Sequence, residues 1–242
     1  QLQRCVALCD PFFRAKRSFA RIVGTQGHHE RHRGRRHAFR PCAGHLLAGQ
    51  GFAVGESFQA RCQVLVAGSS WAPDEDLIIP YFNAHPEMKL VLAPHVVSED
   101  HLKEIEGKLR RPFVRYSRVT EESAARADCL IIDGYGLLSS IYRYGEMAYV
   151  GGGFGVGIHN VPEAAVYGVP VLIGPNNRKF REAQDLLREG GCMEVTDADT
   201  FGRTMDRLLS DGKFLAERGR IAGQYIERNA GASDLIFDSV KF

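Results

Sequence analysis

From Gln63 onward the sequence alternates short apolar runs with longer amphipathic segments, and no other feature constrains the fold as strongly. The apolar runs are typical of strands buried on both faces of a sheet: Val64–Ala67, Lys89–Ala93, Phe113–Tyr116, Asp128–Ile132, Met147–Val150, Pro170–Ile173 and Met193–Val195. The other segments have helical periodicity: Asp74–Ala84, Glu99–Leu109, Glu121–Ala127, Leu137–Tyr144, Pro162–Tyr167, Arg178–Arg188, Ala198–Leu209 and Lys213–Arg228. This alternation predicts an α/β domain with a Rossmann-like parallel sheet and helices on both faces.

The loops that follow the expected strands are rich in glycine, serine, aspartate and histidine. In a parallel sheet these loops share one edge, which is where ligands bind. The sequence therefore predicts a binding site built from five loops: Gly68–Trp71, Pro94-His95, Asp133–Gly136, Gly151–Asn160 and Gly174–Asn177.

The segment Gly151–Asn160 reads GGGFGVGIHN, and it follows an expected strand and precedes an expected helix. Glycines let backbone N–H groups approach a ligand closely, and a helix N-terminus favours a phosphate. The segment lacks the Gly-Lys-Ser/Thr of a Walker loop, and it comes too late in the domain for a dinucleotide fingerprint. A phosphate-binding loop and a plain structural loop both remain open.

The run Asn160-Val161-Pro162-Glu163 also has two interpretations. In the first, which the spacing favours, Asn160 is the N-cap of a helix and Glu163 completes a capping box. In the second, Glu163 accepts hydrogen bonds from ribose hydroxyls. His159, between the glycines of that segment and Asn160, is expected to face the cleft rather than to be buried.

Residues 1–62 differ in composition from the rest. They hold ten Arg and one Lys but three acidic residues, a net charge of +8, and because the whole chain carries +2 the remainder carries −6. The His- and Arg-rich stretch Gly27–His37 raises the possibilities of a zinc site and of a nucleic-acid arm. The Cys and His spacings match no zinc-finger pattern, however, and no aromatic residue interleaves the arginines. A solvated, poorly ordered basic tail is the simpler interpretation.

A shifted reading frame explains the same composition better. Arg, His, Cys, Gly and Ala with almost no Lys or Ile are what GC-rich coding DNA yields when it is translated out of frame. Dropping the first base of plausible codons for Gly27 to Cys42 permits the string AITNVTVAGDTRFDRV. Our hypothesis is that residues 1 to about 62 are out-of-frame translation, and that the true frame resumes near Val64.

Nothing in the sequence points to export or to a membrane span. No apolar run approaches the roughly 20 residues that a spanning helix needs, and Gln1 to Leu8 have no signal-peptide pattern. From residue 63 only Cys129 and Cys192 remain, which is typical of a reducing compartment. We therefore expect a cytoplasmic protein.

Taken together, the glycine segment and its surroundings resemble the C-terminal signature of the Kdo transferases. These GT-B glycosyltransferases of lipopolysaccharide biosynthesis move 3-deoxy-D-manno-octulosonic acid (Kdo) from CMP-Kdo to a lipid A precursor. The resemblance extends over 63–242, and it is carried by Gly151–Gly153, His159, Asn160, Glu163, Pro170, Gly174, Pro175 and Phe180, by Ser69-Ser70 with Asp74-Glu75-Asp76, and by Asp133–Gly136. The chain departs from the family at Ala93-Pro94, where many members have a basic residue, and at Ile158 and Ala164.

The resemblance implies that 63–242 is a donor-binding domain, the C-terminal half of a GT-B fold, and that 1–62 is a separate segment. The implied donor-binding residues are Ser69, Ser70, His95, Gly136, Gly151, Gly152, Gly153, His159, Asn160 and Glu163. Ser69 and Ser70 have an alternative interpretation as caps of the next helix, and Gly136 as a turn. No metal or other cofactor is expected, because the donor carries a single phosphate.

In GT-B enzymes the acceptor site and the general base lie on the N-terminal domain. No such domain precedes residue 63, so no residue here is assigned a catalytic role, and we expect this chain alone to have no transferase activity. The implied partners are CMP-Kdo, a lipid A precursor and, for full-length members, the inner membrane surface, with no nucleic acid. Two alternatives remain: a GT-B transferase or epimerase that uses a UDP-sugar, and a non-catalytic binding module with a nucleic-acid tail.

Overall fold

The computed structural model describes residues 62–229, while residues 1–61 and 230–242 lie outside the described part. Seven strands form one sheet in which every pairing is parallel. The strands are β1 (Gln63–Ser70), β2 (Met88–Pro94), β3 (Phe113–Arg115), β4 (Cys129–Ile131), β5 (Met147–Val150), β6 (Val171–Ile173) and β7 (Cys192–Glu194). All seven strands expected from the apolar runs are confirmed.

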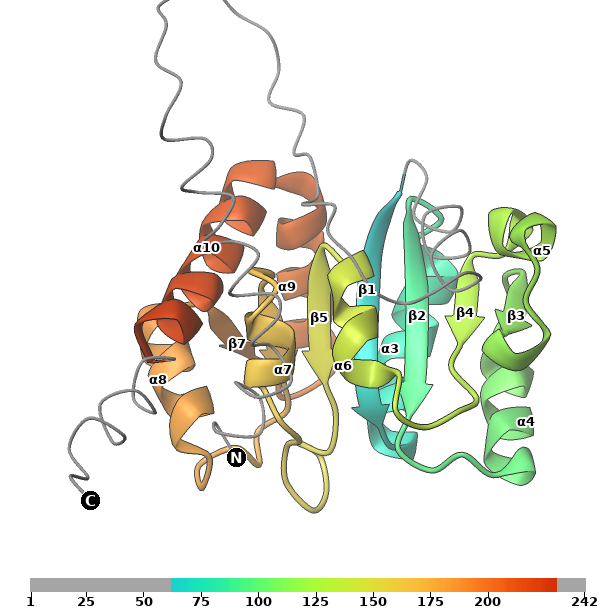
Figure 1. Cartoon of the computed structure of the whole chain (residues 1–242), viewed down its shortest axis with the longest axis horizontal. Helices are drawn as coiled ribbons and strands as arrows, with labels where there is room; N and C mark the ends of the chain where they lie inside the picture. Colours follow the sequence, from blue (N-terminus) through green and yellow to red (C-terminus); the bar gives the residue numbers. More distant parts are fainter. Residues whose placement is uncertain (1–61, 230–242) are drawn as a thin grey trace, which may run out of the picture. The chain divides into compact units, whose positions relative to one another are not determined.

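Helices fill the connections between strands, as the alternation predicts. They are α3 (Ala72–Ala84), α4 (Glu99–Lys108), α5 (Glu121–Arg126), α6 (Leu138–Ile141), α7 (Pro162–Ala165), α8 (Arg181–Glu189), α9 (Ala198–Ser210) and α10 (Gly212–Asn229), with short 3-10 turns η1 (Tyr116–Arg118) and η2 (Tyr142–Tyr144). Helix α3 lies behind the sheet in Figure 1, and α6 and α7 lie in front of it. The expected helix Leu137–Tyr144 is in fact α6 followed by η2.

The core lies between the sheet and these helices. Every residue of Val64–Ala67 in β1 is fully buried, and Leu65 and Ala67 belong to one core cluster with Leu90 of β2 and Phe201 of α9. Burying one such apolar side chain contributes about 1.5–3 kcal/mol. The continuous apolar runs are therefore explained, because both faces of the central strands are covered.

The strand order β3-β4-β2-β1-β5-β6-β7 places a topological switch point between β1 and β5. The chain moves outward from β1 to β2, β3 and β4, then returns to form β5 on the other side of β1. Connections leave β1 and β5 in opposite directions, so a crevice opens outside their carboxyl ends. Trp71 follows β1 and Gly151 follows β5, so both lie at this crevice.

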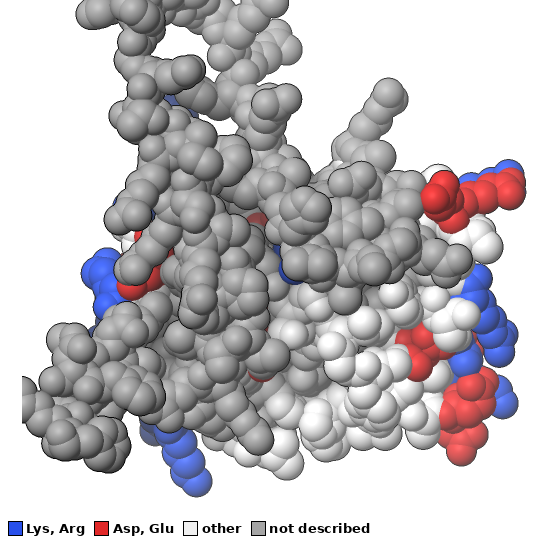
Figure 2. Space-filling model, in the orientation of Figure 1, with Lys and Arg blue, Asp and Glu red and all other residues white. Residues whose placement is uncertain are grey.

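Charged side chains gather over α4 and α5 at one end of the described part, at the right of Figure 2. The ion pair between Arg126 and Glu122 of α5 is among them. No helix within residues 62–229 is long and apolar enough to cross a bilayer. The zinc, nucleic-acid and out-of-frame interpretations concern residues that, apart from Cys62, lie outside the described part.

Candidate functional site

The crevice begins where β1 and the glycine segment touch. A Cβ atom added to Gly151 would lie 2.3 Å from the carbonyl oxygen of Ser69, so only glycine fits at position 151. Ser69 has φ +52°, the one positive φ among the non-glycine residues of 62–229. Strained backbone of this kind collects at functional sites, and here it turns the chain from β1 toward the crevice.

Three aromatic rings meet at the switch point. The indole of Trp71 stacks on the imidazole of His95 with ring centroids 4.5 Å apart, and His95 lies 4.6 Å from the ring of His159. The indole N–H of Trp71 also donates a hydrogen bond of 3.3 Å to Nε2 of His159. Residues that follow β1, β2 and β5 are thus joined in one cluster, which we call the Trp–His cluster (Trp71, His95 and His159).

Asp74 fixes this cluster to the glycine segment. Its buried carboxylate accepts hydrogen bonds from the N–H groups of Trp71 and Gly152, each at 2.9 Å, and from the hydroxyl of Tyr149 at 2.6 Å. Burial and the adjacent Asp74 carboxylate raise the pKa of Tyr149 well above its usual range, so this hydroxyl remains a donor. One carboxylate therefore fixes the loop after β1 and the loop after β5 in position relative to each other.

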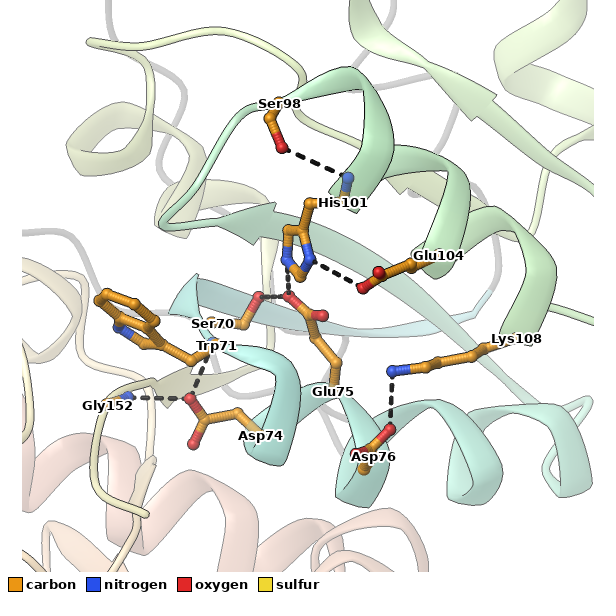
Figure 3. A network of polar contacts seen from close by, with 10 residues as sticks. All are labelled: Ser70, Trp71, Asp74, Glu75, Asp76, Ser98, His101, Glu104, Lys108 and Gly152. Carbon is orange, nitrogen blue, oxygen red and sulfur yellow. Dashed lines mark hydrogen bonds and ion pairs between the residues drawn. The ribbon is translucent and has the colours of Figure 1, made fainter. Parts of the chain in front are cut away.

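Glu75, the next residue, points toward Ser70 and His101 instead (Figure 3). Its carboxylate is fully buried, and Oε1 accepts hydrogen bonds from the hydroxyl of Ser70 at 2.9 Å and from Nε2 of His101 at 3.1 Å. Oε2 is buried and has no hydrogen-bond partner among residues 62–229. Burial raises the pKa of Glu75 despite these contacts. Ser70 is turned toward this network, and the N-cap of α3 is Trp71, so neither serine caps that helix.

A hollow of about 310 Å³ opens beside Trp71. Its lining combines apolar and acidic side chains: Ser70, Trp71, Ala72, Val96, Ser98, Asp100, His101 and Glu104. The carboxylates of Asp100 and Glu104 would repel a phosphate there. A phosphate is therefore unfavourable in this hollow.

The glycine segment uses much of its own hydrogen-bonding capacity. The N–H of Gly151 donates to the carbonyl of Gly68 at 2.9 Å, and the N–H of Gly152 donates to Asp74. Gly153 packs against Gly174, since an added Cβ would lie 2.5 Å from the Cα of Gly174. Two of the three expected phosphate-binding N–H groups are thus already engaged within the protein.

The run that follows His159 does not form the expected capping box. The N-cap of α7 is Val161, one residue later than predicted, and it makes no side-chain capping bond. Instead the side-chain amide of Asn160 donates to the carboxylate of Glu163 at 2.9 Å. The interpretation favoured by the spacing was therefore wrong, because the two side chains pair with each other and leave Glu163 half-buried beside the crevice.

Gly136 lies in the loop after β4. It has φ +84°, and an added Cβ would meet nothing within 4 Å. The adjacent Tyr135 is 76% exposed. The carboxylate of Asp133 ties this loop to the backbone N–H of Ser117 at 2.8 Å. The structure thus gives Gly136 a turn conformation on an open loop, and its role toward a ligand stays a prediction.

The electrostatics favour a neutral His159. Burial lowers its pKa, and neighbouring His95 lowers it further, while Asp74 opposes both effects. Within residues 62–229 no group of three or more His, Cys, Asp or Glu side chains could hold a metal ion. The chemistry that the cluster offers is hydrogen bonding and ring stacking.

Sequence reasoning included Trp71 in a loop but gave no role to it or to Asp74. A signal was present for Trp71, which is the single tryptophan of the chain and directly follows a strand in a polar loop. The contacts of Asp74 join residues 75 and 78 positions apart, to Tyr149 and Gly152, which no local pattern predicts.

Comparison with known proteins gives related sequences but no matching family model. The chain is 28% identical over 183 residues to the 3-deoxy-D-manno-octulosonic acid transferase of Aquifex aeolicus (strain VF5), covering 72% of this chain and 50% of that protein. It is 30% identical over 183 residues to the enzyme of the same name from Chlamydia muridarum (strain MoPn / Nigg), covering 71% and 40%. The chain thus spans about half the length of the curated relatives it matches.

Among solved structures, the chain is similar to the C-terminal CMP-Kdo binding domain of WaaA from Acinetobacter baumannii. The TM-score is 0.63 at 22% identity, over 73% of this chain and 98% of that one. The fold defines the class of domain: the described residues form a Rossmann-like parallel sheet with a switch-point crevice, the fold of that C-terminal domain. Within that class the sequence similarity is to the Kdo transferases, which confirms the resemblance.

Proposed function

We propose that residues 62–229 bind CMP-Kdo as the donor-binding half of a Kdo transferase of lipopolysaccharide biosynthesis. The observation that carries this proposal is the convergence of Trp71, His95 and His159 at the switch point, in a chain whose relatives are named Kdo transferases. A lipid A precursor as acceptor and the inner membrane surface as place of action belong to the same proposal. So does the division of the chain into 1–62 and a donor-binding domain of 63–242.

The ribose is assigned to Glu163. Its carboxylate is half-buried and is held by the amide of Asn160. A carboxylate oxygen accepts two hydrogen bonds readily, so Glu163 can keep Asn160 and still accept from ribose hydroxyls. Asn160 is then a positioning residue for Glu163.

The donor phosphate needs a hydrogen-bond donor or a cation when CMP leaves. In the proposed reaction a sugar hydroxyl of the acceptor attacks the anomeric carbon of Kdo, and the bond from that carbon to the phosphate oxygen breaks. The engaged N–H groups of Gly151 and Gly152 are poorly suited to this phosphate. His159, near the end of the glycine segment, is the better candidate.

Binding of CMP by the full chain tests the proposal. Calorimetric titration should give saturable binding of CMP and weaker binding of UMP, which differs from CMP only in the base. Glu163→Gln should weaken CMP binding roughly tenfold, because hydrogen bonds to charged groups contribute about 1.5–3 kcal/mol. Preference for UDP over CMP would instead favour a UDP-sugar enzyme.

Turnover is a separate matter. Because the chain spans about half of its curated relatives, we propose that it has no transferase activity by itself. Transfer of Kdo from CMP-Kdo to a lipid A precursor by the purified chain would contradict this.

A further inference from the structure

Trp71 is the single tryptophan among 242 residues, and it lies between two histidines of the candidate site. Its backbone N–H is fixed by Asp74, and its ring is fixed by stacking on His95. The indole N–H is thereby directed at one atom, Nε2 of His159, at 3.3 Å.

This contact determines where His159 carries its proton. An indole N–H can only donate, so Nε2 of His159 must accept and must be unprotonated. A neutral imidazole with a bare Nε2 carries its proton on Nδ1, because the bond made by one ring nitrogen sets the state of the other. Within residues 62–229 no hydrogen-bond partner is found for that Nδ1–H, and His159 is only half-buried.

We propose that Trp71 is a positioning residue that holds His159 in its Nδ1–H form, so that His159 donates a hydrogen bond to a phosphate oxygen of the donor nucleotide. The role toward phosphate rests on the proposed function, whereas the protonation form of His159 does not. A phosphate is the fitting acceptor because the N–H groups of Gly151 and Gly152 are engaged elsewhere.

The groups around His159 favour a neutral imidazole as the hydrogen-bond donor. The groups that face His159 are His95, from the loop after β2, and the Asp74 carboxylate, from the start of α3. The carboxylate is already occupied by Trp71, Tyr149 and Gly152. Burial and the neighbouring imidazole of His95 both lower the pKa of His159, so the cluster favours a neutral N–H donor over an imidazolium at this position.

Nuclear magnetic resonance of the ligand-free full chain tests the protonation form directly. Two-bond ¹H–¹⁵N correlation spectra distinguish the two neutral forms of histidine, and His159→Gln identifies the signal among nine histidines. We expect the Nδ1–H form in the wild type and a shift toward the Nε2–H form in Trp71→Phe, which keeps a ring but loses the N–H. His101→Gln is the matched control, since His101 contacts Glu75 and Glu104 rather than His159. Protonation on Nε2 in the wild type, or an unchanged form in Trp71→Phe, would overturn the proposal.

The role toward phosphate is tested by CMP affinity. Trp71→Phe should weaken CMP binding about fivefold, the equivalent of one neutral hydrogen bond, and His159→Gln should weaken it at least as much. Cytidine, which lacks the phosphate, should bind both variants and wild type alike. Equal losses for cytidine and CMP would overturn the phosphate role. If the wild type bound neither ligand while His159 showed the Nδ1–H form, the proposed function would fail and the assigned protonation form would stand.

Discussion

Asp74 and Asp76 are two residues apart on α3, yet their environments differ completely. Asp74 is 1% exposed and accepts three hydrogen bonds, whereas the side chain of Asp76 is 64% exposed and pairs with Lys108 at 2.7 Å. Asp74→Asn should lower the free energy of unfolding by about 2–4 kcal/mol, because charge-assisted bonds between β1 and β5 loops are lost. Asp76→Asn should cost less than about 1 kcal/mol. Equal effects in urea unfolding would show that Asp74 does not hold these loops.

The environment of Glu75 predicts how the free energy of unfolding changes with pH, including the sign of that change. Its pKa is raised by burial, so between the usual carboxyl pKa and the raised value the folded protein binds more protons than the unfolded chain. The stability contributed by this group is full at lower pH and is lost as pH rises through the raised pKa. Glu75→Gln, which can still accept from Ser70 and His101, should remove this dependence.

The unfolding free energies of wild type and Glu75→Gln should be compared from about pH 4 to 8, because an ordinary glutamate, with a pKa of about 4.3, is ionised over most of this range. Relative to wild type, the variant should gain stability as pH rises. The difference between the two proteins cancels the titration of other carboxylates. A difference that is flat, or that falls with pH, would contradict the assigned environment of Glu75.

At the scale of the elements, the crevice is shaped by the close packing of two glycine-containing loops, one after β5 and one after β6. A Cβ on Gly153 would lie 2.5 Å from backbone of Gly174, whereas one on Gly155 would meet nothing within 4 Å. Gly153→Ala should therefore destabilise the domain by about 1–3 kcal/mol, and Gly155→Ala should change it by less than about 0.5 kcal/mol. Thermal unfolding of both variants is the measurement, and a neutral Gly153→Ala would mean that the loops separate readily.

The elements themselves could be predicted from the sequence, because strands buried on both faces leave continuous apolar runs. Met147–Val150 was predicted with the bounds that β5 has. The cap at Asn160 was predicted wrongly, because spacing does not tell whether a side chain bonds to backbone or to another side chain. The position of β4 between β2 and β3 was not predicted either, since strand pairing depends on contacts between residues distant in sequence.

At the scale of the whole molecule, one sheet brings the site together. Loops after β1, β2 and β5 meet only because β1 lies between β2 and β5. The histidines of the Trp–His cluster were expected at one edge, but their stacking with Trp71 follows from the three-dimensional fold.

The emission of Trp71 gives the most direct test that CMP binds at this crevice, because the chain has no other tryptophan. Titration of the full chain with CMP should change this emission saturably, with a midpoint roughly tenfold higher for Glu163→Gln. UDP should act only at higher concentration. A folded protein whose emission does not respond to CMP, or responds to UDP at lower concentration than to CMP, would contradict the assignment of a CMP-Kdo donor site.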